Sequence, residues 1–120
     1  METKMSEFTI YHNPRCSKSR ATLALLEENG LAPNIVLYLE SPLTVSDING
    51  LLKKLAMSAA DITRRGEAEY KEAGLDKLSS EADIVAAIAA HAKLLERPIV
   101  VRGDRAVVGR PPENVLALIN

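Results

Sequence analysis

Residues 8–30 read FTIYHNPRCSKSRATLALLEENG, and this stretch decides the fold. The β-branched and aromatic residues at its start predict a strand over residues 7–11. Residues 21–30 carry apolar side chains at helical spacing and end in a glycine, which is typical of a helix C-terminus. Cys16 is therefore expected on a strand-to-helix turn.

The position of Cys16 predicts a reactive thiol. A thiolate at a helix start accepts hydrogen bonds from unpaired backbone N–H groups and is stabilised by the positive end of the helix dipole. Cationic side chains lie within a few residues, namely Arg15, Lys18, Arg20 and, when protonated, His12. These groups favour the charged form, so we expect the pKa of Cys16 to lie below the ordinary ~8.5.

The same loop is expected to bind an anion. Its N–H groups, with the hydroxyls of Ser17 and Ser19, could hold an oxyanion next to the sulfur. The alternative is that Cys16 is a small buried residue of the core, as single cysteines often are. Residues 12–20 contain no large apolar side chain to surround a core thiol, which favours the reactive nucleophile.

Composition narrows the classes of function. A chain of 120 residues with 47% hydrophobic residues is expected to fold as one domain, residues 1–120. The net charge of −1 and the absence of Trp predict no nucleic-acid partner. The single Cys excludes an internal disulfide, and no metal site is expected. No signal peptide or membrane span is predicted, so a cytoplasmic location and no membrane partner are expected.

The next segments complete a βαβ unit and continue as helices. Residues 35–38 form a continuous apolar run, of the kind buried on both faces of a parallel sheet. Thr44 is expected to cap a helix whose apolar face includes Ile48 and Leu51. A polar loop over 61–66, a brief helix over 67–73 and a helix capped by Ser80 are expected to follow.

The last third returns to β structure. Residues 98–101 and 106–108 are expected to form a hairpin around the turn at 103–104, followed by a C-terminal helix after the prolines. The order β-α-β, helices, β-β-α predicts a thioredoxin/glutaredoxin-like α/β sandwich. Its mixed sheet would be flanked by helices, with a helical insertion between the βαβ and ββα halves.

Three arginines stand where elements begin or end: Arg64, Arg97 and Arg110. The planar guanidinium binds tetrahedral oxyanions through two donors at once. In a thioredoxin-like topology, the Arg97-Pro98 step should lie against the Cys16 loop. The alternative is that each arginine is a solvated loop charge.

Four motifs together resemble one known family. They are Tyr11-His12-Asn13-Pro14-x-Cys16 with Ser19-Arg20, Arg64 ahead of Glu69-Tyr70, Arg97-Pro98-Ile99-Val100-Val101, and Gly109-Arg110-Pro111. Their order and spacing are similar to those of the ArsC-type, glutathione- and glutaredoxin-linked arsenate reductase family. The version HNPRCSKSR resembles one subgroup of it in particular.

The resemblance implies an enzyme that reduces arsenate to arsenite. Cys16 would attack arsenic as a thiolate, glutathione would then add to the arsenic, and glutaredoxin would complete the electron supply. No bound cofactor is implied, glutathione being a co-substrate. His12 would support the low cysteine pKa, and the Arg97-Pro98 bond would be cis. Oxyanion oxygens would be held by Arg64, Arg97, Arg110, Ser19 and Arg20.

The residues after the cysteine depart from the pattern of members most clearly tied to arsenate, which carry Gly and Thr where this chain has Ser17 and Lys18. Two alternatives therefore stay open. One is an ArsC-like protein that acts on another oxyanion or on a glutathione adduct. The other is a non-catalytic redox-sensing module resembling transcription regulators, although these commonly carry a second cysteine where this chain has Ser19.

Overall fold

The computed structural model describes residues 7–119, which divide into two compact units. The sheet unit comprises residues up to Tyr38 and from Arg97 onward, and the helical unit comprises Leu39–Glu96. The single domain expected over residues 1–120 stays a prediction. Within the described residues, no helix is long and apolar enough to cross a membrane.

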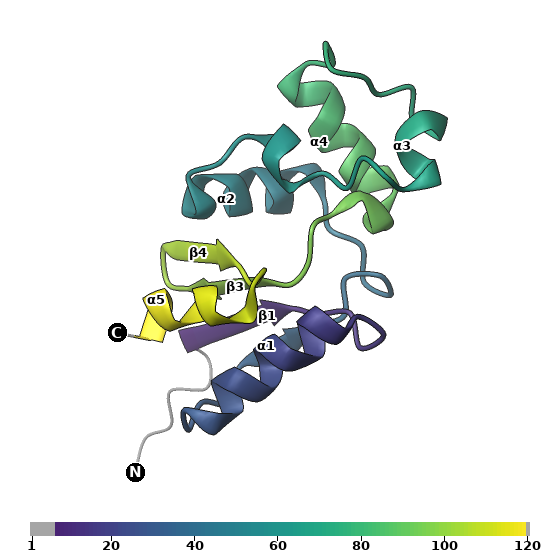
Figure 1. Ribbon diagram of the computed structural model, residues 1–120. Helices are drawn as coiled ribbons and strands as arrows, with labels where there is room; N and C mark the ends of the chain where they lie inside the picture. The colour runs from purple at the N-terminus through teal and green to yellow at the C-terminus, as the bar shows by residue number, and fades with distance from the viewer. Residues whose placement is uncertain (1–6, 120) are drawn as a thin grey trace. The chain divides into compact units, whose positions relative to one another are not determined.

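The sheet unit is built on four strands in the order β2-β1-β3-β4. The strands are β1 (Phe8–Tyr11), β2 (Asn34–Val36), β3 (Ile99–Arg102) and β4 (Arg105–Val108). β1 pairs parallel with β2, and antiparallel with β3, while β3 and β4 form an antiparallel hairpin (Figure 1). The expected mixed sheet and terminal hairpin are confirmed.

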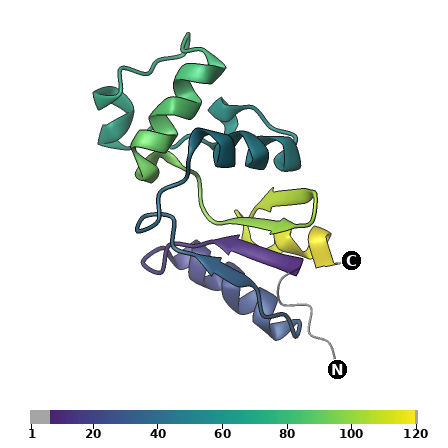
Figure 2. The same ribbon diagram turned by 180° about the vertical axis from the view of Figure 1, so that it is seen from behind.

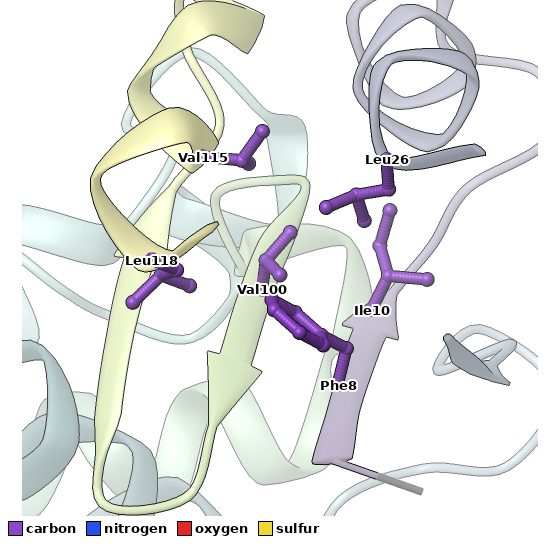
Figure 3. Close-up of a cluster of buried hydrophobic side chains, with 6 residues drawn as sticks. All are labelled: Phe8, Ile10, Leu26, Val100, Val115 and Leu118. Atoms are coloured by element: carbon purple, nitrogen blue, oxygen red, sulfur yellow. The ribbon is translucent and has the colours of Figure 1, made fainter. Parts of the chain in front are cut away.

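The core of the sheet unit lies between one face of the sheet and the helices α1 (Ser17–Glu28) and α5 (Leu116–Ile119). Phe8 and Ile10 alternate along β1 and so point to the same face. They meet Leu26 of α1 and side chains of β3, the 3₁₀ helix η4 (Pro112–Val115) and α5 (Figure 3). This buried cluster holds α1, with Cys16 at its start, against the sheet.

The expectation that residues 35–38 are buried on both faces is wrong for the strand itself. β2 ends at Val36, and Ile35 is 49% exposed. β2 is one of the two edge strands of the sheet and has a strand neighbour only in β1 (Figure 2). An apolar run indicates β structure, but it cannot show whether a strand becomes an edge.

The helical unit contains α2 (Val45–Leu55), α3 (Ala68–Glu72) and α4 (Glu81–Ala90), with the 3₁₀ helices η2 (Ala59–Ile62) and η3 (Ala92–Leu94). Thr44 caps α2, as expected, in a reciprocal capping box with Asp47. Ser80 accepts a hydrogen bond from the N–H of Asp83 at the start of α4. The buried faces of α2 and α4 pack against each other.

An antiparallel bridge between Thr63 and Leu95 ties the helical unit together. The N–H of Arg64 donates to the Leu94 carbonyl, and the N–H of Glu96 donates to the Ile62 carbonyl, both at 2.7 Å. The predicted polar loop is therefore half buried at this point, because its backbone forms a short ladder with a segment much later in the chain. The bridge brings Arg64 and Glu96 side by side.

Candidate active site

Cys16 is the N-cap residue of α1, in an extended conformation with φ −93° and ψ 123°. Its N–H donates to the Asn13 carbonyl at 3.0 Å, and its carbonyl accepts from the N–H of Arg20 at 3.0 Å. The thiol is half-buried and free. The predicted strand-to-helix turn is confirmed, with the sulfur at the positive end of a three-turn helix.

Hydrogen bonds at the helix start outweigh the effect of burial on the thiol. Partial burial is the largest single influence on the pKa of Cys16 and acts to raise it. The backbone N–H of Ser19, the guanidinium of Arg97 and the backbone N–H of Lys18 donate hydrogen bonds that lower it, and the charge of Arg97 adds to them. The net result is a pKa below the ordinary value of a thiol, so the thiolate forms at lower pH.

Arg97 brings a distant part of the chain to the thiol. Its guanidinium bonds Cys16, so the Arg97-Pro98 step lies against the loop as the topology predicted. The peptide bond before Pro98 is cis, as the resemblance implied. The Nε atom of Arg97 is buried and finds no hydrogen-bond partner within the described residues. A buried unsatisfied donor is costly, and an anion beside the thiol could accept its hydrogen bond.

Arg110 lies next to Arg97. Its Nη1 atom donates to the Arg97 carbonyl at 3.4 Å, and its side chain is exposed. Two of the three predicted arginines therefore gather in the sheet unit, one bonded to Cys16 and one to the backbone of the first. The peptide bond between Arg110 and Pro111 is also cis, which sequence reasoning had not anticipated.

A buried polar network holds the Cys16 loop. The Nδ1 atom of His12 lies 2.6 Å from the Ser19 hydroxyl, which also accepts the N–H of Asn13 at 3.0 Å. The Asn13 side chain in turn accepts the N–H of Arg15. His12, Asn13 and Ser19 are all buried, and Ser19 is fully so. Hydrogen bonds between buried side chains and backbone of the motif therefore fix the conformation of the loop between β1 and α1.

This network changes the roles expected for His12 and Ser19. Burial, and secondarily the charge of Arg20, lower the pKa of His12, so its imidazole is neutral at neutral pH. It contacts the Ser19 hydroxyl, and its support of the low cysteine pKa stays a prediction. The Ser19 hydroxyl is engaged by His12 and Asn13 instead of facing an oxyanion. Ser19 meets the thiolate through its backbone N–H.

Comparison with known proteins places the chain. Residues 11–118 match the ArsC family. The chain is 52% identical over 112 residues to the uncharacterized protein YfgD of Escherichia coli K12, covering 92% of this chain and 94% of the relative. It is 47% identical over 112 residues to the arsenate reductase of Haemophilus influenzae, covering 92% and 97%.

The chain belongs to the ArsC family. The solved structure of an arsenate reductase from Vibrio cholerae superimposes with a TM-score of 0.88 at 47% identity, covering 92% of this chain and 95% of that one. The thioredoxin-like fold predicted from the sequence is therefore confirmed. The motifs that suggested the ArsC family lie within the matched residues.

Two other predicted ArsC site residues have partners within their own units. Arg20 is exposed, and its Nη1 atom donates to the Pro14 carbonyl at 2.8 Å, which braces the Cys16 loop. Arg64 lies in the helical unit, where its Nε and Nη1 atoms pair with Glu67 at 3.3 Å and Glu96 at 3.1 Å. For both residues, the oxyanion-binding role stays a prediction.

Sequence reasoning did not single out Thr22, and it quoted Gly109 only as part of the motif Gly109-Arg110-Pro111. Thr22 and Gly109 are buried and contact each other between α1 and the end of β4. A threonine two residues beyond Arg20, the last residue of the motif, carries no signal of its own. Among the described residues, no group of three or more His, Cys, Asp or Glu could hold a metal ion.

Proposed function

We propose that this protein is an arsenate reductase that uses the Cys16 thiolate as nucleophile and takes its electrons from glutathione and glutaredoxin. The observation that carries the proposal is the position of Cys16. Its sulfur lies at the N-terminus of α1, with hydrogen bonds from the Ser19 and Lys18 N–H groups and from Arg97. Relatives with about half of their residues identical are named arsenate reductase.

The site has the charge that attack on arsenate requires. A thiolate that approaches a multiply charged oxyanion is repelled unless fixed positive groups offset the charge. Arg97 and Arg110 lie together in the sheet unit, and the buried Nε of Arg97 is a donor without a partner in the described chain. An arsenate oxygen would satisfy it while the sulfur approaches the arsenic atom. Arg64 is proposed as the third oxyanion-binding arginine.

The electron balance calls for thiols from outside. Cys16 forms a sulfur–arsenic bond as one arsenate oxygen leaves as water, and a glutathione thiol forms a second sulfur–arsenic bond as another oxygen leaves as water. Reduction of As(V) to As(III) takes two electrons, which two thiols supply as they join in a disulfide. Hydrolysis of the remaining bond between Cys16 and As(III) then releases arsenite and restores the thiol. The sequence holds one cysteine, so these thiols come from glutathione and glutaredoxin. Such donors are kept reduced in the cytoplasm, where we propose that the protein acts.

The redox-sensing alternative is less favoured by the site. A sensor that closes a disulfide needs a second thiol beside the first. The matching position is Ser19, whose hydroxyl is fully buried and bonded to His12 and Asn13. The chain instead provides a single nucleophile with neighbouring anion donors, which suits group transfer.

The decisive experiment is a coupled assay with the purified chain, arsenate, glutathione, glutaredoxin, glutathione reductase and NADPH. We expect NADPH consumption that saturates with arsenate and is lost in Cys16→Ser, because a serine hydroxyl is not ionised near neutral pH. Omission of glutaredoxin or glutathione in turn identifies the electron donors.

Ser41→Ala is the matched control, because it removes an exposed hydroxyl outside the Cys16 loop and leaves the backbone donors in place. It should retain turnover. If the wild-type chain shows no arsenate-dependent oxidation while Cys16 still alkylates rapidly at low pH, the arsenate assignment is wrong. The thiol site would then serve another oxyanion or a glutathione adduct.

A further inference from the structure

Thr22 lies in α1, six residues after Cys16, and its side chain is fully buried. Its hydroxyl lies 2.8 Å from the Lys18 carbonyl oxygen and 3.2 Å from the Gly109 carbonyl oxygen. The hydroxyl has a single proton, which the two carbonyls share in a bifurcated hydrogen bond. The shorter contact, to Lys18, is the stronger of the two. Thr22 thereby joins the first turn of α1 to the segment that follows β4.

Gly109 fits against Thr22 only because it has no side chain. A Cβ atom there would lie 2.8 Å from the Thr22 Oγ1 atom, 3.0 Å from the Thr22 Cγ2 atom and 3.0 Å from the Pro98 Cγ atom. The N–H of Gly109 donates to the Pro98 carbonyl at 2.8 Å. Three segments distant in sequence therefore meet at one point, in direct contact and with backbone hydrogen bonds between two of them.

Each segment at this point leads directly to a group of the site. Pro98 follows Arg97, and Gly109 precedes Arg110. The Lys18 carbonyl belongs to the same peptide group as the N–H of Ser19, which donates to the Cys16 sulfur. A hydrogen bond to that carbonyl polarises the peptide and strengthens its N–H as a donor.

We propose that Thr22 is a positioning residue of the reaction. It holds Gly109 against Pro98 and thereby fixes Arg97 and Arg110 relative to Cys16. This inference rests on the proposed function, since it concerns the same anion site. Thr22 touches neither the thiol nor the substrate position. It acts through the backbone of the residues that do.

A purely structural role is the competing explanation. Threonine within a helix commonly bonds the carbonyl four residues earlier, and that contact alone would only stabilise α1. A loss of stability lowers the amount of active enzyme but leaves the affinity of the remaining folded molecules unchanged. The affinity of the site for an anion therefore separates the two roles.

The test compares Thr22→Val, which keeps the shape and loses the hydroxyl, with Thr22→Ser, which keeps the hydroxyl. The readout is protection of Cys16 from alkylation by inorganic arsenate, with sulfate in parallel, because protection needs no turnover. In Thr22→Val the half-protecting arsenate concentration should rise about fivefold, the effect of removing roughly one hydrogen bond from the alignment. In Thr22→Ser the half-protecting arsenate concentration should stay within about twofold of that of the wild-type chain. Thr9→Val in β1 makes the same exchange at another threonine and is the matched control.

Gly109→Ala supplies an independent test. Its added methyl group should displace the segment and weaken arsenate protection more than Thr22→Val does. Two of the three close contacts of that methyl group are with Thr22, so Thr22→Ala should relieve part of the effect. The double variant should therefore be non-additive, with a smaller loss than the sum of the single variants.

Unchanged protection in Thr22→Val, equal weakening in the Val and Ser variants, or full additivity of the double variant would each overturn the positioning role. Absence of protection in the wild-type chain would overturn it too, because no anion site would exist to align. Failure of the proposed function has a different signature: protection by arsenate persists and depends on the Thr22 hydroxyl, while coupled turnover is absent.

Discussion

At the scale of single residues, the thiol depends on three donors that come from two parts of the chain. Two are backbone N–H groups of the first turn of α1, and the third is the guanidinium of Arg97. The backbone donors follow from the strand-to-helix turn. Arg97 can act only because β3 lies beside β1, which brings its start next to the Cys16 loop.

The pH dependence of Cys16 alkylation tests this arrangement. In the wild-type chain, the rate should reach half its maximum below the ordinary thiol value of ~8.5. Arg97→Ala should move that midpoint to higher pH, since it removes both a hydrogen bond and a positive charge from the sulfur. Arg110→Ala is the matched control, because Arg110 bonds the Arg97 carbonyl, and its midpoint should move less. Equal midpoints in all three proteins would contradict this account.

His12 links the loop to stability at mildly acidic pH. Its pKa in the folded chain is lowered by burial, so the unfolded chain binds the proton more readily, with a pKa of ~6.5. The free energy of unfolding should therefore fall as the pH drops below about 6.5 and level off below the folded-state pKa.

His12→Asn keeps a hydrogen-bonding group for Ser19 without titrating. Denaturant unfolding between pH 7.5 and 5.5 should show a smaller loss of stability in this variant than in the wild-type chain. Thr9→Val in β1 changes no ionisable group. It serves as control and should keep the wild-type slope. Parallel slopes in the His12→Asn and wild-type chains would contradict the lowered pKa.

At the scale of elements, short-range signals set the helix boundaries. Thr44 and Asp47 cap α2 reciprocally at 3.0 Å each, and Gly30 takes a φ of +78° just after the end of α1. Both features depend on residues within a few positions of the boundary. That is why the sequence predicted the Thr44 cap and the helix end at Gly30, although it did not predict the reciprocal bond from Asp47.

The capping box of α2 can be tested by Thr44→Ala. Loss of the side-chain acceptor should reduce the free energy of unfolding by about 1 kcal/mol, because an N–H at the helix start then has no partner. Thr44→Ser keeps the acceptor and should lie close to the wild-type chain. Chemical denaturation measures both. Equal stability of the Ala and Ser variants would show that the cap contributes nothing.

At the scale of the whole molecule, each unit has its own buried side chains. Leu26 belongs to the cluster of the sheet unit, and Ile48 is fully buried on α2 in the helical unit. If the chain folds as the single domain expected from its length, both units unfold together. Truncation of either side chain should then reduce one shared free energy of unfolding by about 2–5 kcal/mol.

Native-state hydrogen exchange of Leu26→Ala and Ile48→Ala measures this cooperativity. Within each variant, the slow amides of β1, β3, α2 and α4 should all lose the same amount of protection. Val45→Ala, an exposed position on α2, is the control and should change little. Loss of protection confined to the unit that carries the substitution would mean that the two units open independently.

From the sequence alone we predicted the strand–loop–helix around Cys16, the helix caps, the terminal hairpin and the resemblance to the ArsC family. These depend on interactions within a few residues and on patterns that repeat along the chain. It also identified Cys16 and Arg97 correctly as neighbours, through the predicted topology. It misjudged β2, which it expected to be buried on both faces.

Only the tertiary structure decided which groups meet across the chain. β2 became an exposed edge because the order of strands leaves it a single neighbour, and the Ser19 hydroxyl was turned inward by His12. Thr22 and Gly109, far apart in sequence, came into contact because α1 and the end of β4 pack on the same core. Such contacts depend on how whole elements pack, and no local pattern of residues encodes them.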